Sequence, residues 1–277
     1  MGNQNDELIR KHYKAEAEKH GTAPTSTLPD EVYRQKEIEV IRNFLLKAKN
    51  MLGKQHLKVV DIGCGNGYTL SVLAGEIPEH EFWGFEFTEE LLAIAQDRKI
   101  SNCRFQKADV RSLDSSGDYF DVVFTERCLI NVLDWEEKKK ALIEINRILL
   151  PGGYYLMLEN FTDGLADINK ARGEFGLGEL KETYHNRYFE KTQFFEFIQR
   201  LFIEIKPEEL NDDDSDFKFY NNYLSSYFFF SRFFHPLLSL AVHCEPAHNT
   251  EFVKFFSNMP PVGNYAAPQA HFLKKPM

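Results

Sequence analysis

Residues 59–68 read Val59-Val60-Asp61-Ile62-Gly63-Cys64-Gly65-Asn66-Gly67-Tyr68. The β-branched apolar run predicts a strand, the three alternating glycines predict a tight turn, and the residues from Tyr68 onward predict a helix. Glycines let such a turn adopt positive φ, and they let a ligand lie against bare backbone at the helix N-terminus. The stretch therefore predicts a strand–turn–helix junction that holds a ligand.

The spacing of the glycines distinguishes between ligands. A dinucleotide-binding loop has the pattern G-x-G-x-x-G, but here Tyr68 stands at the position of the third glycine. Asp61, two residues before the first glycine, suits a ligand with a cationic amine and would repel a pyrophosphate. The pattern D-x-G-x-G-x-G resembles motif I of class I S-adenosylmethionine-dependent methyltransferases, and on its own it also fits a glycine-rich turn in another α/β protein.

Composition narrows the class of protein and its partners. The 277 residues are 43% hydrophobic, which is enough for one large domain or for one domain with an insertion. The formal net charge of −9 argues against a nucleic-acid partner. No apolar run of ~18 residues predicts a membrane span, and the polar residues 1–6 predict no secretory leader. The four cysteines are scattered, which predicts free thiols and a cytoplasmic location.

Strands and helices alternate between residues 58 and 159. The predicted strands are 58–62, 82–86, one beginning at 103, 119–125 and 154–159, and the predicted helices are 68–75, 89–99 and 135–149. This order predicts a doubly wound parallel sheet, in which ligands lie beyond the carboxyl ends of the strands.

Acidic residues stand at these strand ends. Glu86 ends the second strand, where one carboxylate can accept two ribose hydroxyls, as it also does in NAD-binding proteins; the alternative is a solvent-facing residue at a strand end. Asp109, followed by Val110, is placed to accept from an adenine amino group, or it is a simple turn residue. Glu126 and Arg127 end the fourth strand and either contact the ligands or pair with each other.

The whole stretch from 59 to 159 is similar to the core of class I S-adenosylmethionine-dependent methyltransferases. The similarity is carried by the glycine loop, Glu86, Asp109, the strand Phe120-Asp121-Val122-Val123 and the turn Leu149-Leu150-Pro151-Gly152-Gly153. It implies a Rossmann-like, seven-stranded doubly wound α/β sheet, with S-adenosylmethionine as cofactor and S-adenosylhomocysteine as product. The cofactor contacts that it implies are Asp61, Gly63, Gly65, Gly67, Glu86, Phe87, Asp109, Val110, Thr125 and Glu126.

Four segments are expected. Residues 1–53 form an N-terminal helical cover, residues 54–205 the cofactor-binding core, residues 206–268 a helical insertion or lid, and residues 269–277 the last strand of the core sheet. The insertion is inferred because about sixty residues separate the sixth and seventh strands, far more than the ~2–5 of a hairpin loop. Within the cover, a helix is predicted to start with a Ser or Thr cap at Ser26 or Thr27 and Pro29 in its first turn, and to end at Gly53.

The flanks resemble methyltransferases of bacterial surface-polysaccharide gene clusters. This similarity is carried by Ser26-Thr27-Leu28-Pro29-Asp30, Arg34, Glu37, Asn169, Arg172, His185-Asn186 and residues 225–232. It implies O-methylation of a sugar or glycan intermediate. The alternatives are an N- or carboxyl-methyltransferase acting on another small metabolite and, more remotely, a non-catalytic S-adenosylmethionine-binding protein.

His185 is the predicted catalytic base, since a hydroxyl acceptor must lose its proton during methyl transfer. A structural histidine is the alternative. Tyr184 and Asn186 are predicted to orient the acceptor.

Three arginines, Arg127, Arg172 and Arg232, are candidates for binding an anionic acceptor, with ion pairs as the alternative. No metal is expected, because His235, His243 and His248 match no standard zinc spacing. The oligomeric state stays open.

Overall fold

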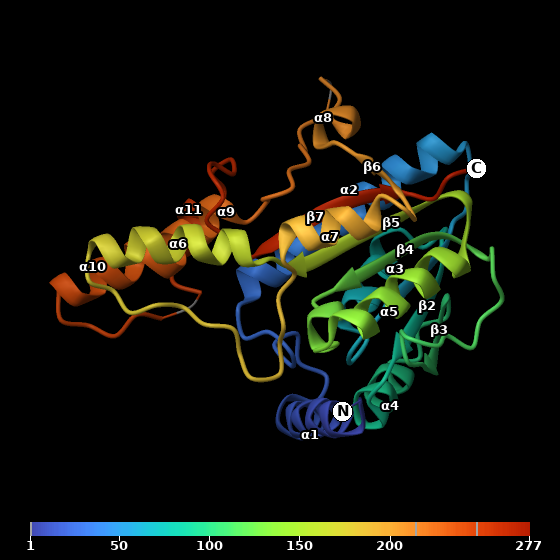
Figure 1. Ribbon diagram of the computed structural model, residues 1–277, viewed down its shortest axis with the longest axis horizontal. Helices are drawn as coiled ribbons and strands as arrows, with labels where there is room; N and C mark the ends of the chain where they lie inside the picture. The colour runs from blue at the N-terminus through green and yellow to red at the C-terminus, as the bar shows by residue number, and fades with distance from the viewer. Residues whose placement is uncertain (1, 214, 248) are drawn as a thin grey trace.

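The computed structural model describes residues 2–213, 215–247 and 249–277 and contains one seven-stranded sheet (Figure 1). The strands lie in the order β3-β2-β1-β4-β5-β7-β6. Their bounds are β1 Lys58–Ile62, β2 Glu81–Glu86, β3 Cys103–Lys107, β4 Phe120–Glu126, β5 Leu149–Asn160, β6 Ile203–Ile205 and β7 Pro268–Lys274. The strands β1 to β5 pair in parallel, and β7 runs antiparallel to both β5 and β6. The predicted doubly wound, seven-stranded sheet is confirmed.

Helices cover both faces of this sheet. Their bounds are α1 Gly2–His20, α2 Glu31–Leu52, α3 Tyr68–Glu76, α4 Glu89–Asp97, α5 Trp135–Ile148, α6 Thr162–Glu174, α7 Lys191–Ile198, α8 Pro207–Leu210, α9 Ser225–Phe228, α10 His235–Ala241 and α11 Glu251–Phe256, with a 3₁₀ turn η1 at Leu129–Asn131 and a π-helical segment η2 at Phe229–Phe234. Within the described part of the chain, none of these helices has the length and apolar character needed to cross a membrane.

Two hydrophobic clusters form the core. On one face of the sheet, α2 and α3 pack against alternate strand residues such as Val59 and Val122. On the other face, α5 and α7 pack against the intervening residues, such as Val60 and Val123. The central strands are thus covered on both sides, which explains why they are nearly continuous apolar runs in the sequence.

The start of α2 differs from the sequence prediction. Asp30 is the N-cap, with a side-chain oxygen that accepts from the Tyr33 N–H at 3.0 Å, so Pro29 lies before the helix. The predicted Ser or Thr cap is wrong, because Asp is an equally good cap and Asp30 stands three residues closer than Thr27 to the helical stripe. The end of α2 at Gly53, with φ of 63°, is as predicted.

Asp30 also joins α2 to the 206–268 segment. Its carboxylate accepts from the Tyr227 hydroxyl and from Arg232, both at 2.5 Å. That segment is helical in α8 to α11, and α9, α10 and α11 lie together with α6 to one side of the sheet (Figure 1). The division of the chain into cover, core, insertion and last strand stays a prediction.

Gly164 lets α6 approach the chain that leads into β7. A Cβ on Gly164 would lie 1.9 Å from the carbonyl oxygen of Ala266, which is backbone and cannot rotate away. Gly173, in the last turn of the same helix, has no atom within 4 Å of the equivalent position.

We therefore expect Gly164→Ala to destabilise the protein by about 2–3 kcal/mol or more, through forced displacement of α6. The matched variant Gly173→Ala should be neutral or stabilising by up to about 1 kcal/mol, because alanine favours the helix. Urea unfolding of both variants measures the difference. Equal stability of the two would show that α6 does not pack as described.

Candidate active site

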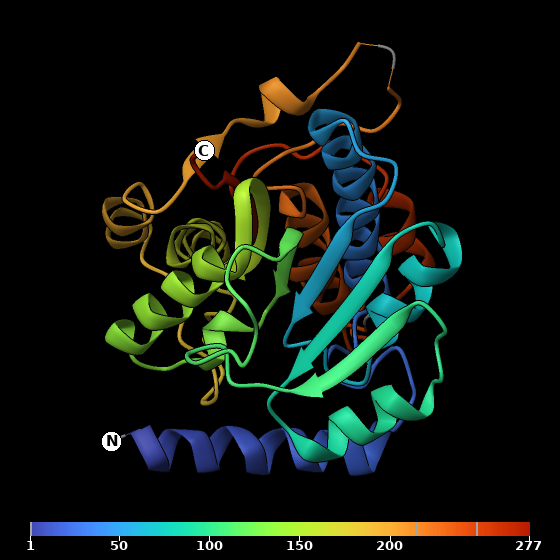
Figure 2. The same cartoon turned by 90° about the vertical axis from the view of Figure 1, so that its right-hand side faces the viewer.

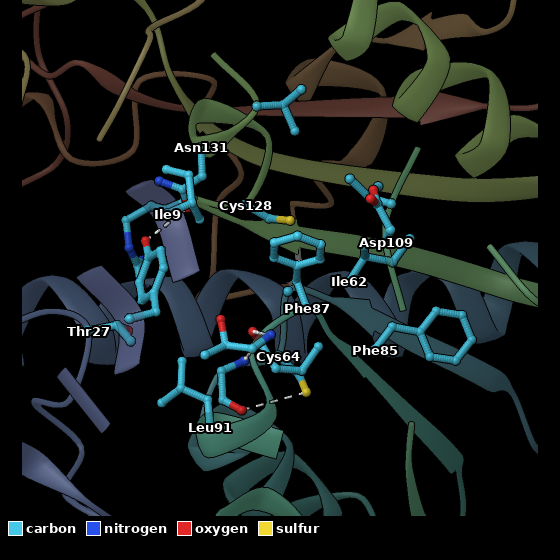
Figure 3. A pocket seen from close by; sticks show the side chains of 18 of the residues that line it. Ile9, Thr27, Ile62, Cys64, Phe85, Phe87, Leu91, Asp109, Cys128 and Asn131 are labelled. Atoms are coloured by element: carbon cyan, nitrogen blue, oxygen red, sulfur yellow. Dashed lines mark hydrogen bonds between the residues drawn. The ribbon is translucent and has the colours of Figure 1, made fainter. Parts of the chain in front are cut away.

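A cavity of about 640 Å³ opens beyond the carboxyl ends of β1 to β4. Asp109 follows β3, Glu86 ends β2, Gly63 and Gly65 follow β1, and Glu126 ends β4, and all five line the cavity. Because the strands lie in the order β3-β2-β1-β4, an extended ligand would meet these groups in the same order. In Figure 3, Asp109 lies on one side of the cavity, and Ile9, Thr27 and Asn131 lie on the other.

The glycine loop requires residues without side chains. Gly63 and Gly65 have φ of 82° and 55°, values that other L-residues rarely adopt. A Cβ on Gly63 would lie 2.6 Å from the sulfur of Cys128, whereas one on Gly65 would meet only a Thr27 methyl group at 3.9 Å. Gly63 therefore allows β4 to approach, and Gly65 leaves bare backbone on the cavity wall.

Glu86 connects the glycine loop to the end of β2. One carboxylate oxygen accepts from the Gly65 N–H and the other from the Thr88 N–H, each at 2.8 Å. Burial raises the pKa of Glu86, and these N–H groups act against that rise. Each oxygen keeps accepting capacity for a further donor, such as a ligand hydroxyl.

Asp109 is fixed by Arg111. Its oxygens accept from the Arg111 backbone N–H at 2.9 Å and from the guanidinium at 2.5–2.8 Å. Burial acts to raise the pKa of Asp109, but the hydrogen bonds from Arg111 outweigh it, and the pKa lies below its ordinary value. Arg111 also pairs with Asp6 of α1 at 2.9 Å, so Asp109 is connected to the N-terminal helix.

The helix α1 closes one side of the cavity. It crosses the end of the sheet beside α4 (Figure 2) and contributes Gln4, Asn5, Asp6, Ile9 and Tyr13 to the lining. The sequence predicted a helical cover over residues 1–53, but not that its first helix lines the cavity. These polar residues form no motif, so nothing in the sequence marked them.

The end of β4 carries a buried charged cluster. Arg127 has φ of 53°, which is uncommon for a residue other than glycine, and its guanidinium pairs with the fully buried Glu37 of α2. Burial raises the pKa of Glu37 to about 7, against the opposing effect of Arg127. Arg34, one turn earlier on α2, lines the cavity and donates to the Thr27 hydroxyl at 2.9 Å.

Glu159 of β5 fixes the chain that follows Arg127. Its carboxylate accepts from three successive backbone N–H groups, those of Cys128, Leu129 and Ile130, at 2.9–3.1 Å. This places Cys128 and Asn131 on the cavity wall. No motif in the amino-acid sequence indicated this role of Glu159.

The residues predicted to contact the cofactor divide into two groups. Those that line the cavity are Gly63, Gly65, Glu86, Phe87, Asp109, Val110 and Glu126. Gly67 starts α3 and packs against α4 and β3, and the buried Thr125 hydroxyl lies 3.0 Å from that of Tyr155. Asp61 is buried behind the loop, where one carboxylate oxygen has no partner among the described residues, and burial together with Glu126 and Glu86 raises its pKa.

Arg127 is the only one of the three predicted anion-binding arginines that lines the cavity. Its charge is matched by Glu37. Arg172 donates to the backbone carbonyls of Gly178 and Arg232, and Arg232 pairs with Asp30. Each guanidinium therefore has bonding partners within the protein.

His185 and its neighbours lie behind the cavity wall. The His185 ring stacks on His12 at 3.7 Å, and burial together with His12 lowers its pKa to about 4. Tyr184 is mostly exposed and bonds to His12 at 2.9 Å. Asn186 accepts from Asn131 at 2.8 Å, and Asn131 in turn accepts from Tyr13, so two lining residues separate this group from the cavity.

Within the described parts of the chain, no three His, Cys, Asp or Glu side chains gather as a metal site. Of the histidines considered for zinc, His248 lies outside the described residues.

Comparison with known proteins agrees with this geometry. A methyltransferase-domain family model matches residues 59–153. An uncharacterized methyltransferase of Schizosaccharomyces pombe is 32% identical over 35% of this chain and 37% of its own. The demethylmenaquinone methyltransferase of Staphylococcus aureus is 32% identical over 40% and 46%. The matched region thus spans less than half the length of these relatives.

Among solved structures, a Haloferax volcanii putative methyltransferase in complex with the Trm112 activator covers 80% of this chain and 83% of its own, with 16% identity and a TM-score of 0.49. Residues 59–153 thus match a methyltransferase domain, and the seven-stranded sheet to which they contribute has the strand order typical of the class I methyltransferase fold. The cofactor of the domain is S-adenosylmethionine.

The pairing of Asp6 with Arg111 fastens α1 over the cavity. We expect Asp6→Asn to raise hydrogen exchange in α1 up to about fivefold, because a partly exposed ion pair contributes 0–1 kcal/mol. Glu7→Gln, which changes an exposed neighbour in the same helix, is the control. Unchanged exchange in both variants would mean that other contacts of α1, such as the hydrogen bond from Tyr13 to Asn131, keep it in place.

Proposed function

We propose that this protein is an S-adenosylmethionine-dependent methyltransferase that methylates a hydroxyl group of a sugar or glycan intermediate. The observation that carries the proposal is the order of groups along the cavity: two carboxylates, Asp109 and Glu86, and then the glycine loop. These groups are the hydrogen-bond acceptors and the bare backbone that an adenosyl group with an amino-acid tail requires.

The donor set fits this cofactor. Glu86 is the proposed partner of the ribose hydroxyls. Asp109 and Val110 are the proposed partners of the adenine, which would lie beside the ring of Phe87. Asp61, whose buried oxygen has no partner among the described residues, suits a cationic amine near the loop. Gly67 and Thr125 are proposed to support the cavity wall from behind, whereas Gly63, Gly65 and Glu126 form part of the wall itself.

When bound, S-adenosylmethionine supplies a methyl group on a positively charged sulfur. The protein's own part is to position the acceptor in line and to exclude water, and such positioning can supply ~7–11 kcal/mol of the barrier. The helix α1 and the ordered chain at Cys128 and Asn131 serve that purpose. The location is proposed to be cytoplasmic.

His185 stays the proposed base, with Tyr184 and Asn186 as orienting groups. Its contact with the cavity is indirect, through Asn131, whose side chain donates to the His185 carbonyl at 3.2 Å. Arg127 is the proposed acceptor contact closest to the cofactor, while Arg172 and Arg232 are proposed to act on the acceptor from the side of α6 and η2.

We expect Glu86→Gln to weaken S-adenosylhomocysteine binding about 10- to 100-fold, since a hydrogen bond to a charged group contributes about 1.5–3 kcal/mol. Glu81→Gln, at the exposed opposite end of the same strand, should leave the affinity unchanged. Isothermal titration measures both, with NAD as the competing ligand. Tight NAD binding without S-adenosylhomocysteine binding would refute the assignment.

We expect His185→Ala to lower kcat for methyl transfer from labelled S-adenosylmethionine to a sugar about 10²- to 10⁴-fold, with unchanged cofactor affinity. Because its pKa is about 4, the ring is neutral and able to accept a proton at any pH well above 4, so activity should be flat from pH 5.5 to 8 and fall below about 4. His56→Ala is the control. A kcat equal to that of the control would remove His185 from the mechanism.

A further inference from the structure

Two lining residues beyond the glycine loop carry polar atoms without partners. They are the Nε of Arg34 and one carboxylate oxygen of Glu126, and neither has a hydrogen-bond partner in the part of the chain that is described. The two residues are 6% and 9% exposed. A buried polar atom left without a partner costs about 1–3 kcal/mol, so two such atoms in residues that line one cavity point to a ligand that satisfies them.

Glu37 and Arg127 lie close to these groups, since both act electrostatically on Arg34, and Arg127 itself lines the cavity. The backbone N–H of Arg127 donates to the Leu158 carbonyl at 2.8 Å, and this contact accompanies its left-handed conformation. Its guanidinium reaches Glu37, which is fully buried. A strained residue of this kind persists where the surrounding structure fixes it, and such residues cluster at functional sites.

The charges around this corner limit what can bind. Arg127 is matched by Glu37, and Arg34 lies close enough to Glu126 for the two to interact electrostatically. An anionic group would meet the carboxylate of Glu126, and a cationic group would meet Arg34. A hydroxyl both donates and accepts, so neighbouring hydroxyls satisfy the Arg34 N–H and the Glu126 oxygen together.

Arg34 can also be reached from outside the cofactor half of the cavity. A second, more open cavity of about 620 Å³, lined by α2 and by Lys254 and Ser257 at the end of α11, shares Arg34 and Tyr68 with the first. The two cavities are therefore separated by these side chains. Arg34 therefore borders a second opening, on the side of α2, that does not include Glu86 or Asp109.

We infer that Arg34 and Glu126 bind an uncharged, hydroxyl-rich acceptor through its hydroxyl groups, and that Glu37 is a positioning residue that fixes Arg127 beside them. This inference rests on the proposed methyltransferase function and narrows its acceptor class. Neutral sugars bind, whereas uronic and phosphorylated sugars are excluded by the carboxylate of Glu126.

The test uses the full chain saturated with S-adenosylhomocysteine. The probes are the methyl glycosides of glucose, galactose and mannose, compared with glucuronic acid and glucose 1-phosphate, and saturation-transfer NMR gives each Kd. At least one neutral glycoside should bind ten times more tightly than either charged sugar. Preference for a charged sugar, or no binding by any neutral probe, overturns the inference, while failure of S-adenosylhomocysteine itself to bind overturns the proposed function instead.

Arg34→Lys keeps the charge but removes the Nε–H. It should therefore raise the Kd of the tightest-binding neutral glycoside at least tenfold and leave the Kd of S-adenosylhomocysteine within twofold of its original value. Arg200→Lys, which changes an exposed residue after α7, is the matched control.

Glu37→Gln should raise the KM of the acceptor and not that of S-adenosylmethionine, relative to the control variant Glu196→Gln. An equal rise in both KM values would show a merely structural role, and an Arg34→Lys result equal to its control would refute the contact.

Discussion

The cavity depends on the attachment of the glycine loop to the end of β2. The Glu86 carboxylate accepts from Gly65, and the Phe85 carbonyl accepts from the N–H groups of Gly63 and Cys64. These bonds bend the chain sharply at the point where β1 ends and α3 begins. Since the loop has almost no side chains, its backbone becomes the wall of the cavity, and every other lining element is arranged around it. A side chain on Gly63 would push β4 away and open the wall.

The remaining walls are closed by pairs of charges between segments that are far apart in the chain. Arg111 joins the turn after β3 to Asp6 of α1, and Arg127 joins the end of β4 to Glu37 of α2. Each pair brings a helix of the N-terminal segment over the ends of the strands. The partly exposed pair of Arg111 and Asp6 adds little to stability, whereas removal of one partner of the buried pair of Arg127 and Glu37 would leave an uncompensated charge. The N-terminal helices are thus part of the cavity as well as its cover.

The sequence predicted the parts of this protein that are encoded locally. The loop at 61–67 and the alternation of strands and helices gave the sheet, and the acids at Glu86 and Asp109 were placed on the cavity because strand ends share one edge. The partners of the arginines were not predictable, since Glu37 lies 90 residues from Arg127 and no periodicity relates them. The contribution of α1 was missed for the same reason, and the cap at Asp30 was missed because Pro29 suggested an earlier start.

The same difference between local and long-range contacts explains why similarity to other proteins over residues 59–153 indicates the kind of domain but does not identify the acceptor. The region 59–153, which matches other methyltransferases, contains the loop and both acids, whereas Arg34 and Glu37 lie outside it on α2. The N-terminus of α2 is bound in turn to the 206–268 segment, because the Asp30 cap also accepts from Tyr227 and Arg232. A substitution in that segment could therefore shift Arg34, which lies one helical turn after Asp30, without altering any residue between 59 and 153. The proposed acceptor contact thus depends on the 206–268 segment, whereas the Glu86 and Asp109 end of the cavity lies within residues 59–153.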